Sequence, residues 1–323
     1  MLYPLTFEPR FKERVWGARN IERLYGKPLP SGLRIGESWE ITDRPDDVSV
    51  IRNGPLAGKD VRWLMERHST ELLGTAPAES GRFPLLIKIL DANDKLSLQV
   101  HPPKSKAAAL GGEPKTEMWY IADAAPGADL FVGLKNGVTR EGFESKLANG
   151  SVADCFHRLE VKRGDAMFLP SGRVHAIGGG NVIFEIQQNS DTTYRVFDWN
   201  RPGLDGKPRE LHVSESLASI NFDDFEPGLI PDMVLTGPKG SIRPLVNDSL
   251  FNVEALHLET GSELYWSERA CGIVGVVSGQ FRVTGGGQTL ELKAGDFCLL
   301  PAALEAATIA ATHSGTLLNV LAR

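Results

Sequence analysis

The chain consists largely of short segments with strand character that are separated by turns containing Gly or Pro. Such segments run from SWEITDRPDDVSVIRN (residues 38–53) to GTLLNVLA (residues 315–322). Many short strands at this spacing are typical of a β-sandwich or barrel. Helical patterns are confined to a few segments, chiefly residues 59–74, 140–150 and 212–222, which we interpret as insertions. The sequence therefore predicts an all-β protein with a few helical insertions.

Length and composition limit the number of domains to one or two. A chain of 323 residues with 41% hydrophobic residues is long enough to bury a sizeable core, as one large domain or two ordinary ones. The segment DFEPGLIPDMVLTGPKGSIRPL is rich in Pro and Gly and is followed by further strand patterns. We expect this segment to cross between domains near residue 235. The predicted domains are residues 1–235 and residues 236–323.

Charge and cysteine content narrow the class of partner and the compartment. The formal net charge of −6 argues against nucleic-acid and anionic-membrane partners, because both require a basic face. Cys155, Cys271 and Cys298 are widely separated and show no CxxC spacing, so we expect reduced thiols. The first 17 residues contain no apolar signal core, and no apolar run is long enough to span a membrane. A cytoplasmic location is expected.

The stretch GDAMFLPSGRVHAIGGG, residues 164–180, reads as a strand, a tight Pro-Ser-Gly turn and a second strand. A single histidine stands directly after the turn. The spacing G-x5-P-x-G-x2-H is met by Gly164, Pro170, Gly172 and His175. This spacing resembles the second signature of the cupin superfamily, although Gly179 replaces the asparagine usually found four residues after the histidine. The resemblance implies a jelly-roll barrel with a metal site.

The later half of the chain repeats this signature only in part. GDFCLLPAALEA has Gly295, Asp296 and Pro301 at the same spacing, but Ala303 and Ala306 stand where the glycine and histidine would be. We therefore expect two cupin-type jelly-roll barrels, of which the second lacks metal ligands.

Strand alternation places other polar residues where they could form a metal site with His175. In KLSLQVHPP, strand alternation places Ser97, Gln99 and His101 on one face and apolar residues on the other. In PKTEMWYI, the same alternation places Lys115 and Glu117 on one face. Two imidazole nitrogens and two oxygens form a set suited to zinc and tolerable for Fe(II), Mn or Co. The candidate ligands are Gln99, His101, Glu117 and His175. For the remaining histidines we expect surface or packing roles: His68, His157, His212, His257 and His313.

Five motifs together resemble one enzyme family. FPLLIKIL, LSLQVHP, KTEMWYI, GDAMFLPSGRVHAIG and SDTTYRVFDWNR occur in this order. In this respect the chain is similar to the class I mannose-6-phosphate isomerases, in the short bacterial form, from Val15 to about Arg201 and more loosely to the C-terminus. The resemblance implies interconversion of mannose 6-phosphate and fructose 6-phosphate with one zinc per chain. It also implies Gln99, His101, Glu117 and His175 as ligands and Arg195 as a catalytic residue. KTE replaces the more usual Lys-Pro-Glu.

Independently of the family resemblance, the chemistry of such a reaction requires a cation and a base. Moving a carbonyl between C1 and C2 requires removal of a proton beside the carbonyl and its return to the neighbouring carbon through an enediolate. A fixed cation such as Arg195 stabilises the negative charge that develops on oxygen. Glu185, on the same strand face as Gln187, is the preferred base. A metal-bound hydroxide is the alternative, because zinc lowers the pKa of its water to about 7.

A sugar phosphate also requires placed cations in an acidic chain. Lys88 interrupts an apolar strand, which costs desolvation unless its ammonium reaches a cavity or a partner. The alternative is an edge strand with Lys88 facing water. We expect Lys88, Ser97 and Lys115 to form a substrate-binding cluster at the barrel mouth. Glu37 and Glu40 in GESWEI could contribute to the site, but acidic residues on a strand more often face solvent, and we expect them to do so.

Two other functions fit part of the pattern. A cupin dioxygenase would use His101, Glu117 and His175 to hold Fe(II). A non-catalytic cupin that binds sugars is the second alternative, disfavoured because no helix-turn-helix module is visible and the second barrel ends the chain. The sequence leaves the oligomeric state open.

Overall fold

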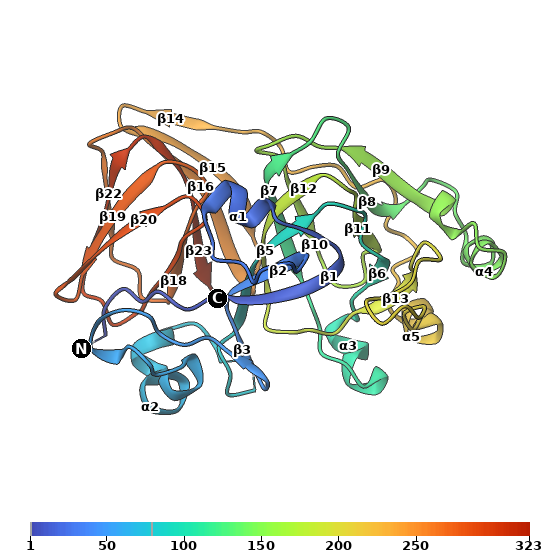
Figure 1. Ribbon diagram of the computed structural model, residues 1–323, viewed down its shortest axis with the longest axis horizontal. Coiled ribbons are helices and arrows are strands. Elements are labelled where there is room, and N and C mark those ends of the chain that lie inside the picture. Colours follow the sequence, from blue (N-terminus) through green and yellow to red (C-terminus); the bar gives the residue numbers. More distant parts are fainter. Residues whose placement is uncertain (1, 79) are drawn as a thin grey trace.

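The computed structural model describes residues 2–78 and 80–323, in which antiparallel strands dominate (Figure 1). The first half of the chain forms two sheets. The six-stranded sheet has the order β1 (Arg10–Ala18), β2 (Ile35–Ile41), β5 (Leu85–Ala92), β12 (Asn181–Gln188), β7 (Glu117–Ala124) and β10 (Ala166–Leu169). The five-stranded sheet has the order β13 (Tyr194–Phe197), β6 (Leu98–Val100), β11 (His175–Ile177), β8 (Asp129–Leu134) and β9 (Phe156–Glu160).

The second half also forms two sheets, drawn in orange and red in Figure 1. The six-stranded sheet has the order β14 (Leu235–Gly237), β15 (Gly240–Asn247), β16 (Phe251–Leu258), β23 (Gly315–Ala322), β18 (Gly272–Val276) and β21 (Phe297–Leu300). The four-stranded sheet has the order β17 (Glu263–Trp266), β22 (Ala307–His313), β19 (Gln280–Gly285) and β20 (Gln288–Lys293). A short hairpin pairs β3 (Asp43–Arg44) with β4 (Asp47–Val48).

Helices are few and lie in the segments that connect strands. They are α1 (Asn20–Tyr25), α2 (Val61–Leu73), α3 (Lys104–Ala107), α4 (Arg140–Ala148) and α5 (Val213–Ser219), with 3-10 turns at Gly54–Leu56, Ala108–Leu110 and Val152–Cys155. α2 and α4 begin with side-chain caps, because Asp60 accepts from the Trp63 N–H and Thr139 accepts from the Gly142 N–H. The three expected helical segments correspond to α2, α4 and α5.

The central strands of the first sheet are buried on both faces, and this arrangement creates the polar interior. In β12, Val182, Phe184 and Ile186 pack in a core shared with the second half of the chain. The intervening residues Ile183 and Glu185 point to the other face, toward the five-stranded sheet, where Ile183 joins a separate apolar cluster. Strand alternation therefore turns Glu185 into the space between the two sheets.

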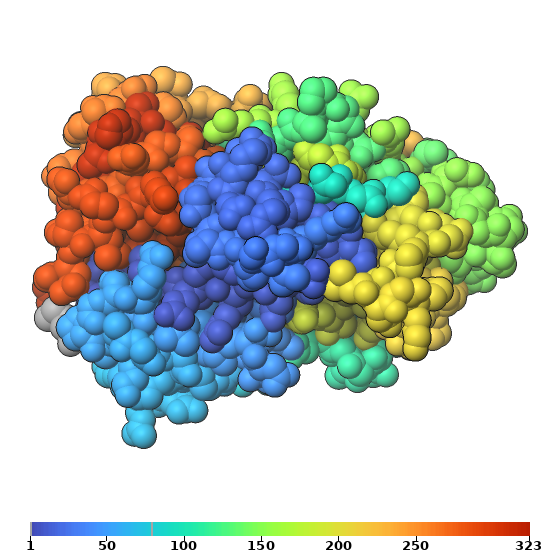
Figure 2. All heavy atoms as spheres, in the orientation of Figure 1, coloured from blue at the N-terminus to red at the C-terminus, as the bar shows by residue number. Residues whose placement is uncertain are grey.

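The N-terminal segment ties the two halves together. The Leu5 N–H donates to the Leu299 carbonyl, and the Leu299 N–H donates to the Leu5 carbonyl. Further along the chain, Gly74 forms an isolated antiparallel β-bridge with Ala270. In the space-filling view the blue N-terminal segment lies over the boundary between the orange half and the green and yellow half (Figure 2). One hydrophobic core therefore spans both halves.

The all-β prediction with few helices is confirmed. Each half consists of two separate sheets rather than one closed sheet. The space between the two C-terminal sheets is filled by apolar side chains such as Trp266, Phe281 and Val283. The domain boundary between residues 235 and 236 stays a prediction. None of the helices in the described ranges has both the length and the apolar character needed to cross a membrane.

Candidate active site

The expected turn brings His175 to the middle of the five-stranded sheet. Gly172 has a φ of +93°, the left-handed region that favours glycine, and its N–H donates to the His101 carbonyl at 2.9 Å. β11 then begins at His175, which pairs with Gln99 of β6 and Val132 of β8. The turn therefore fixes His175 beside the strand that carries Gln99 and leads to His101.

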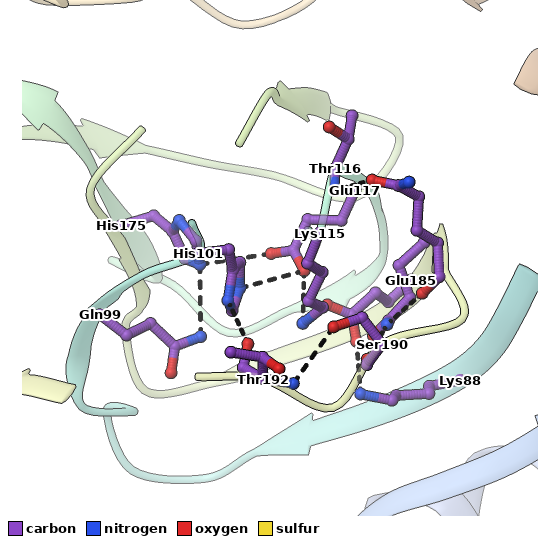
Figure 3. A network of polar contacts seen from close by, with 12 residues as sticks. Lys88, Gln99, His101, Lys115, Thr116, Glu117, His175, Glu185, Ser190 and Thr192 are labelled. Carbon is purple, nitrogen blue, oxygen red and sulfur yellow. Dashed lines mark hydrogen bonds and ion pairs between the residues drawn. The ribbon is translucent and has the colours of Figure 1, made fainter. Parts of the chain in front are cut away.

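His101, Glu117 and His175 converge in the interior, as Figure 3 shows. One potential ligand atom from each residue lies within 4.8 Å of the others. His101 Nε2 is 3.5 Å from Glu117 Oε2, and His175 Nε2 is 3.3 Å from Glu117 Oε1. All three side chains are almost completely buried. The structure therefore brings these three candidate ligands together.

Hydrogen bonds fix the tautomer of both imidazoles. His101 Nδ1 lies 2.8 Å from the Thr192 carbonyl oxygen, and His175 Nδ1 lies 2.9 Å from that of Arg173. A carbonyl oxygen only accepts, so Nδ1 donates in each case and Nε2 carries a lone pair. Burial lowers the pKa of His101 to about 3, with Lys115 adding to the effect, and burial also lowers the pKa of His175. Both imidazoles are therefore neutral at neutral pH.

The donor set fits a divalent cation. His101 Nε2 and Glu117 Oε1 are buried and make no hydrogen bond within the described ranges. Two lone pairs that face a carboxylate repel it unless a proton or a cation lies between them. The Gln99 Nε2 donates to His175 Nε2 at 3.3 Å, and rotating its amide by 180° would place an oxygen there instead. Gln99 therefore stands where a fourth ligand could reach the cluster.

Two lysines and two carboxylates adjoin the cluster. Lys115 Nζ is 2.6 Å from Glu117 Oε2 and 3.7 Å from Glu185 Oε1. Lys88 Nζ is 3.4 Å from Glu185 Oε2. Burial alone would raise the pKa of Glu117, but Lys115 and His101 hold it well below its ordinary value. Burial alone would lower the pKa of Lys115, but Glu117 and Glu185 raise it above its ordinary value. Lys115 and Glu117 therefore stabilise each other's charges.

Glu185 has the properties expected of a proton acceptor. It is 3% exposed, and burial raises its pKa although Lys115 and Lys88 oppose the shift. The Trp119 indole N–H donates to Glu185 Oε1 at 3.2 Å, across the paired strands β12 and β7. This hydrogen bond leaves Oε2 beside Lys88 and orients the carboxylate.

These groups line a cavity of about 540 Å³, a volume typical of small-molecule sites. The lining includes Gln99, Lys115 and Glu185, and the buried cluster of His101, Glu117 and His175 adjoins it through Gln99 and Lys115. An apolar wall completes the cavity and consists of Trp16, Leu90, Leu96, Trp119 and Ile177. A ligand in the cavity would meet the lysines and Glu185 directly.

The three predicted substrate-binding residues all line this cavity. Lys88, Ser97 and Lys115 are each 4% exposed, so they lie in the cavity wall and not at an open mouth. Lys88 belongs to β5, which has neighbours on both sides, and it is not on an edge strand. Trp16 and Trp119 also line the cavity.

The expectation that Glu37 and Glu40 face solvent is wrong. Glu37 is 8% exposed and Glu40 is 5% exposed, and β2 lies inside the sheet between β1 and β5. Glu40 pairs with Lys27 away from the cavity, whereas Glu37 lines the cavity and pairs with Arg14 at 2.7 Å. Arg14 also lines the cavity, and the sequence analysis did not single it out. Strand alternation in GESWEI places Glu37 on the same face as Trp39, and this apolar neighbour was the available signal that Glu37 is buried.

Arg195 lines the same cavity from β13, directly across from Gln99. Its Nη1 donates to the Glu210 carbonyl at 2.7 Å, and its Nε is buried without a hydrogen bond among the described residues. Burial, together with Arg209, lowers the pKa of Arg195 from its ordinary value, yet an arginine stays charged at neutral pH. Asp198 pairs with Arg201 and Arg209 instead. Arg195 is therefore a cation held by backbone contacts.

The chain is similar to known proteins over most of its length. The sequence profile of the type I phosphomannose isomerase catalytic domain matches residues 5–129. Mannose-6-phosphate isomerase ManA of Bacillus subtilis is 37% identical and covers 92% of this chain and 93% of its own length. Mannose-6-phosphate isomerase of Streptococcus mutans is 35% identical, with 93% of each chain covered. The crystal structure of a mannose 6-phosphate isomerase from Bacillus subtilis superimposes with a TM-score of 0.89 at 31% identity, over 99% of both chains.

Proposed function

The chain belongs to the mannose-6-phosphate isomerase family, and on this basis we propose that it interconverts mannose 6-phosphate and fructose 6-phosphate in the cavity of its first half. The observation that carries the proposal is the cavity itself. Two buried lysines, a buried carboxylate of raised pKa and an arginine line one cavity next to a cluster suited to a metal. These are the groups that an enediolate reaction on an anionic sugar requires.

The metal site is proposed to consist of His101, Glu117 and His175, with Gln99 as a fourth ligand. Two imidazole nitrogens and two oxygens form a set that suits zinc, and we propose zinc as the native metal. When bound, the metal would act as a Lewis acid toward the oxygens of the sugar. The neutral, oriented imidazoles and the ionised Glu117 support this assignment.

Proton transfer is proposed to use Glu185. In the aldose-to-ketose direction, the Glu185 carboxylate takes the proton from C2, which leaves an enediolate spread over C1 and C2. The Glu185 carboxyl then delivers a proton to C1, and the hydroxyl proton of O2 passes to O1. The raised pKa of Glu185 strengthens it as a base, and the Trp119 hydrogen bond aims it. Glu185 is preferred to a hydroxide because it lines the cavity.

Cations around the cavity are proposed to bind the substrate and stabilise its charge. Lys88, Ser97 and Lys115 would contact the hydroxyls or phosphate of the sugar, since all three line the cavity. Arg195 is proposed to stabilise the enediolate, since its Nε has no hydrogen bond of its own in the described part of the chain. The predicted partner is thus a small sugar phosphate, and the predicted location is cytoplasmic.

A coupled assay tests this function. Metal-loaded protein with mannose 6-phosphate should yield fructose 6-phosphate, a chelator should abolish the turnover, and zinc should restore it. Metal-dependent oxygen uptake without isomerisation would instead favour a dioxygenase. Tight binding of sugar phosphate without turnover would favour a non-catalytic binding protein.

A further inference from the structure

Charged side chains alternate in sign across the sheet that forms one wall of the cavity. Each neighbouring strand contributes one residue, in the strand order β1, β2, β5, β12 and β7. Successive distances between charged atoms are 2.7, 3.8, 3.4, 3.7 and 2.6 Å along Arg14, Glu37, Lys88, Glu185, Lys115 and Glu117. Lys115 lies two residues before Glu117, the first residue of β7. The row therefore links the edge of the sheet to the candidate metal cluster.

Both carboxylate oxygens of Glu37 are already held by neighbouring side chains. Its Oε1 accepts a hydrogen bond from Arg14 Nε at 2.7 Å, and its Oε2 accepts one from the Trp39 indole N–H at 2.6 Å. Burial alone would raise the pKa of Glu37, but Arg14 and Lys88 lower it to about 2. Glu37 is therefore a fixed negative charge in the cavity wall, and it acts on the cavity through its neighbours.

Lys88 is the neighbour through which Glu37 can act. Its ammonium lies 3.8 Å from Glu37 and 3.4 Å from Glu185, and it makes no hydrogen bond with the described residues. It also lies 5.1 Å from the centre of the Trp39 ring. Two carboxylates on opposite sides keep the ammonium from pairing closely with either, which leaves its N–H groups for a ligand.

The sequence specifically accommodates Arg14 beside Glu37. A Cβ at Gly36 would come within 2.6 Å of both Arg14 Cβ and Trp16 Cζ3. Only glycine lets the stems of these two cavity residues lie against β2. The Arg14 guanidinium thereby reaches the carboxylate of the residue that follows the glycine.

We propose that Arg14 and Glu37 form a positioning pair that holds the Lys88 ammonium away from Glu185, ready to bind a substrate oxygen. The inference rests on the proposed isomerase function. Loss of the Glu37 charge lets Lys88 pair directly with Glu185, which removes a donor from the substrate and engages the proposed base. Glu37 is thus a positioning residue, and Lys88 is the group that touches the substrate.

A double-mutant cycle measures this coupling through kcat/KM. Glu37→Gln keeps the size of the side chain and removes its charge, and it should lower kcat/KM about 10- to 100-fold, the range seen for supporting residues of active sites. In a Lys88→Gln background, the same change should alter kcat/KM by less than about twofold, because the group through which it acts is gone. Equal losses in both backgrounds would overturn the proposal.

Matched variants separate positioning from folding. Glu40→Gln removes a buried carboxylate on the same strand that pairs with Lys27 outside the cavity, and it should leave kcat/KM unchanged. Glu37→Asp should recover part of the activity because it keeps the charge. Arg14→Gln should lower kcat/KM less than Glu37→Gln does. If Glu37→Gln fails to fold, Arg14→Gln replaces it as the test variant. Full activity of both Arg14→Gln and Glu37→Gln would overturn the proposal.

A crystal structure of Glu37→Gln gives a readout that does not depend on turnover. The distance from Lys88 Nζ to Glu185 Oε2 should shorten from 3.4 Å to about 2.8 Å, that of a charge-assisted hydrogen bond. An unmoved ammonium would overturn the inference. If the wild-type protein shows no isomerisation, the proposed function fails, and this structure still decides whether Glu37 positions Lys88. If the wild-type protein turns over and Lys88 does not move, only the inference fails.

Discussion

Replacement of Lys115 by methionine tests whether Lys115 is the counter-charge of Glu117 in the metal-free protein. Their charged atoms are 2.6 Å apart, and both side chains are buried. At an effective dielectric constant of about 20, two unit charges at this distance attract by about 6 kcal/mol before desolvation is counted. Removal of one partner of a buried pair typically costs about 3–5 kcal/mol. At about 2–4 °C per kcal/mol, Lys115→Met should lower Tm by about 6–20 °C in the presence of a chelator.

Zinc should remove much of this loss. A dication between Glu117 and the imidazoles replaces the missing positive charge, and it no longer meets repulsion from Lys115. Thermal melts of wild type and Lys115→Met are therefore compared in chelator and with one equivalent of zinc. The difference in Tm should be less than half as large with zinc as in chelator.

Lys27→Met provides the matched control. Lys27 and Glu40 form another buried ion pair, at 2.8 Å, which lies outside the cavity. This variant should be destabilised to the same extent in chelator and in zinc. An equal loss of Tm for Lys115→Met under both conditions, or no loss in chelator, would refute the assigned electrostatic role of Lys115.

Three further predictions concern the site. His101→Ala and His175→Ala should each lose both bound metal and activity, whereas His257→Ala and His313→Ala should keep both; mass spectrometry of the intact protein gives the metal content. Free mannose should have a kcat/KM at least about 100-fold below that of mannose 6-phosphate, and comparable values would indicate an isomerase of unphosphorylated sugars. Arg195→Ala should lower kcat roughly 100-fold while KM and Tm change little, and Arg195→Lys should recover little of the loss; a raised KM at constant kcat would assign Arg195 to the phosphate.

The residues that could be predicted from the sequence owe their placement to local geometry. Strand alternation alone puts Lys115 and Glu117 on one face, and the turn at Gly172 fixes the start of the strand at His175. Both relations depend on residues only a few positions apart. The structure brings these side chains together as expected, and it makes Glu185 a cavity residue by the same alternation.

The partners of Glu37 could not be predicted in this way. β2 lies between β1 and β5 in the sheet, and the contacts of Glu37 with Arg14 and Lys88 join segments 23 and 51 residues away. A strand that alternates polar residues fits a solvent-exposed face equally well when its neighbours are unknown. Only the sheet order distinguishes the two cases.

The position of Arg209, a loop residue of the cavity, could not be predicted from the sequence either. It lines the cavity because Asp198 binds its guanidinium through two oxygens, each at 2.6 Å, and this pair fixes the segment after β13. Nothing in the spacing of the two residues specifies that contact. The place of loop residues such as Arg209 in the cavity therefore requires the tertiary structure.

The most direct test of the proposed chemistry follows mannose 6-phosphate by NMR in D2O with metal-loaded protein. Proton transfer through Glu185 predicts fructose 6-phosphate that carries deuterium at C1 in a measurable fraction of molecules, because the carboxyl proton exchanges with solvent between the two transfers. Glu185→Gln should keep its metal and form neither the product nor the exchanged sugar. Absence of fructose 6-phosphate, product without any deuterium, or an active Glu185→Gln variant would contradict the proposed reaction.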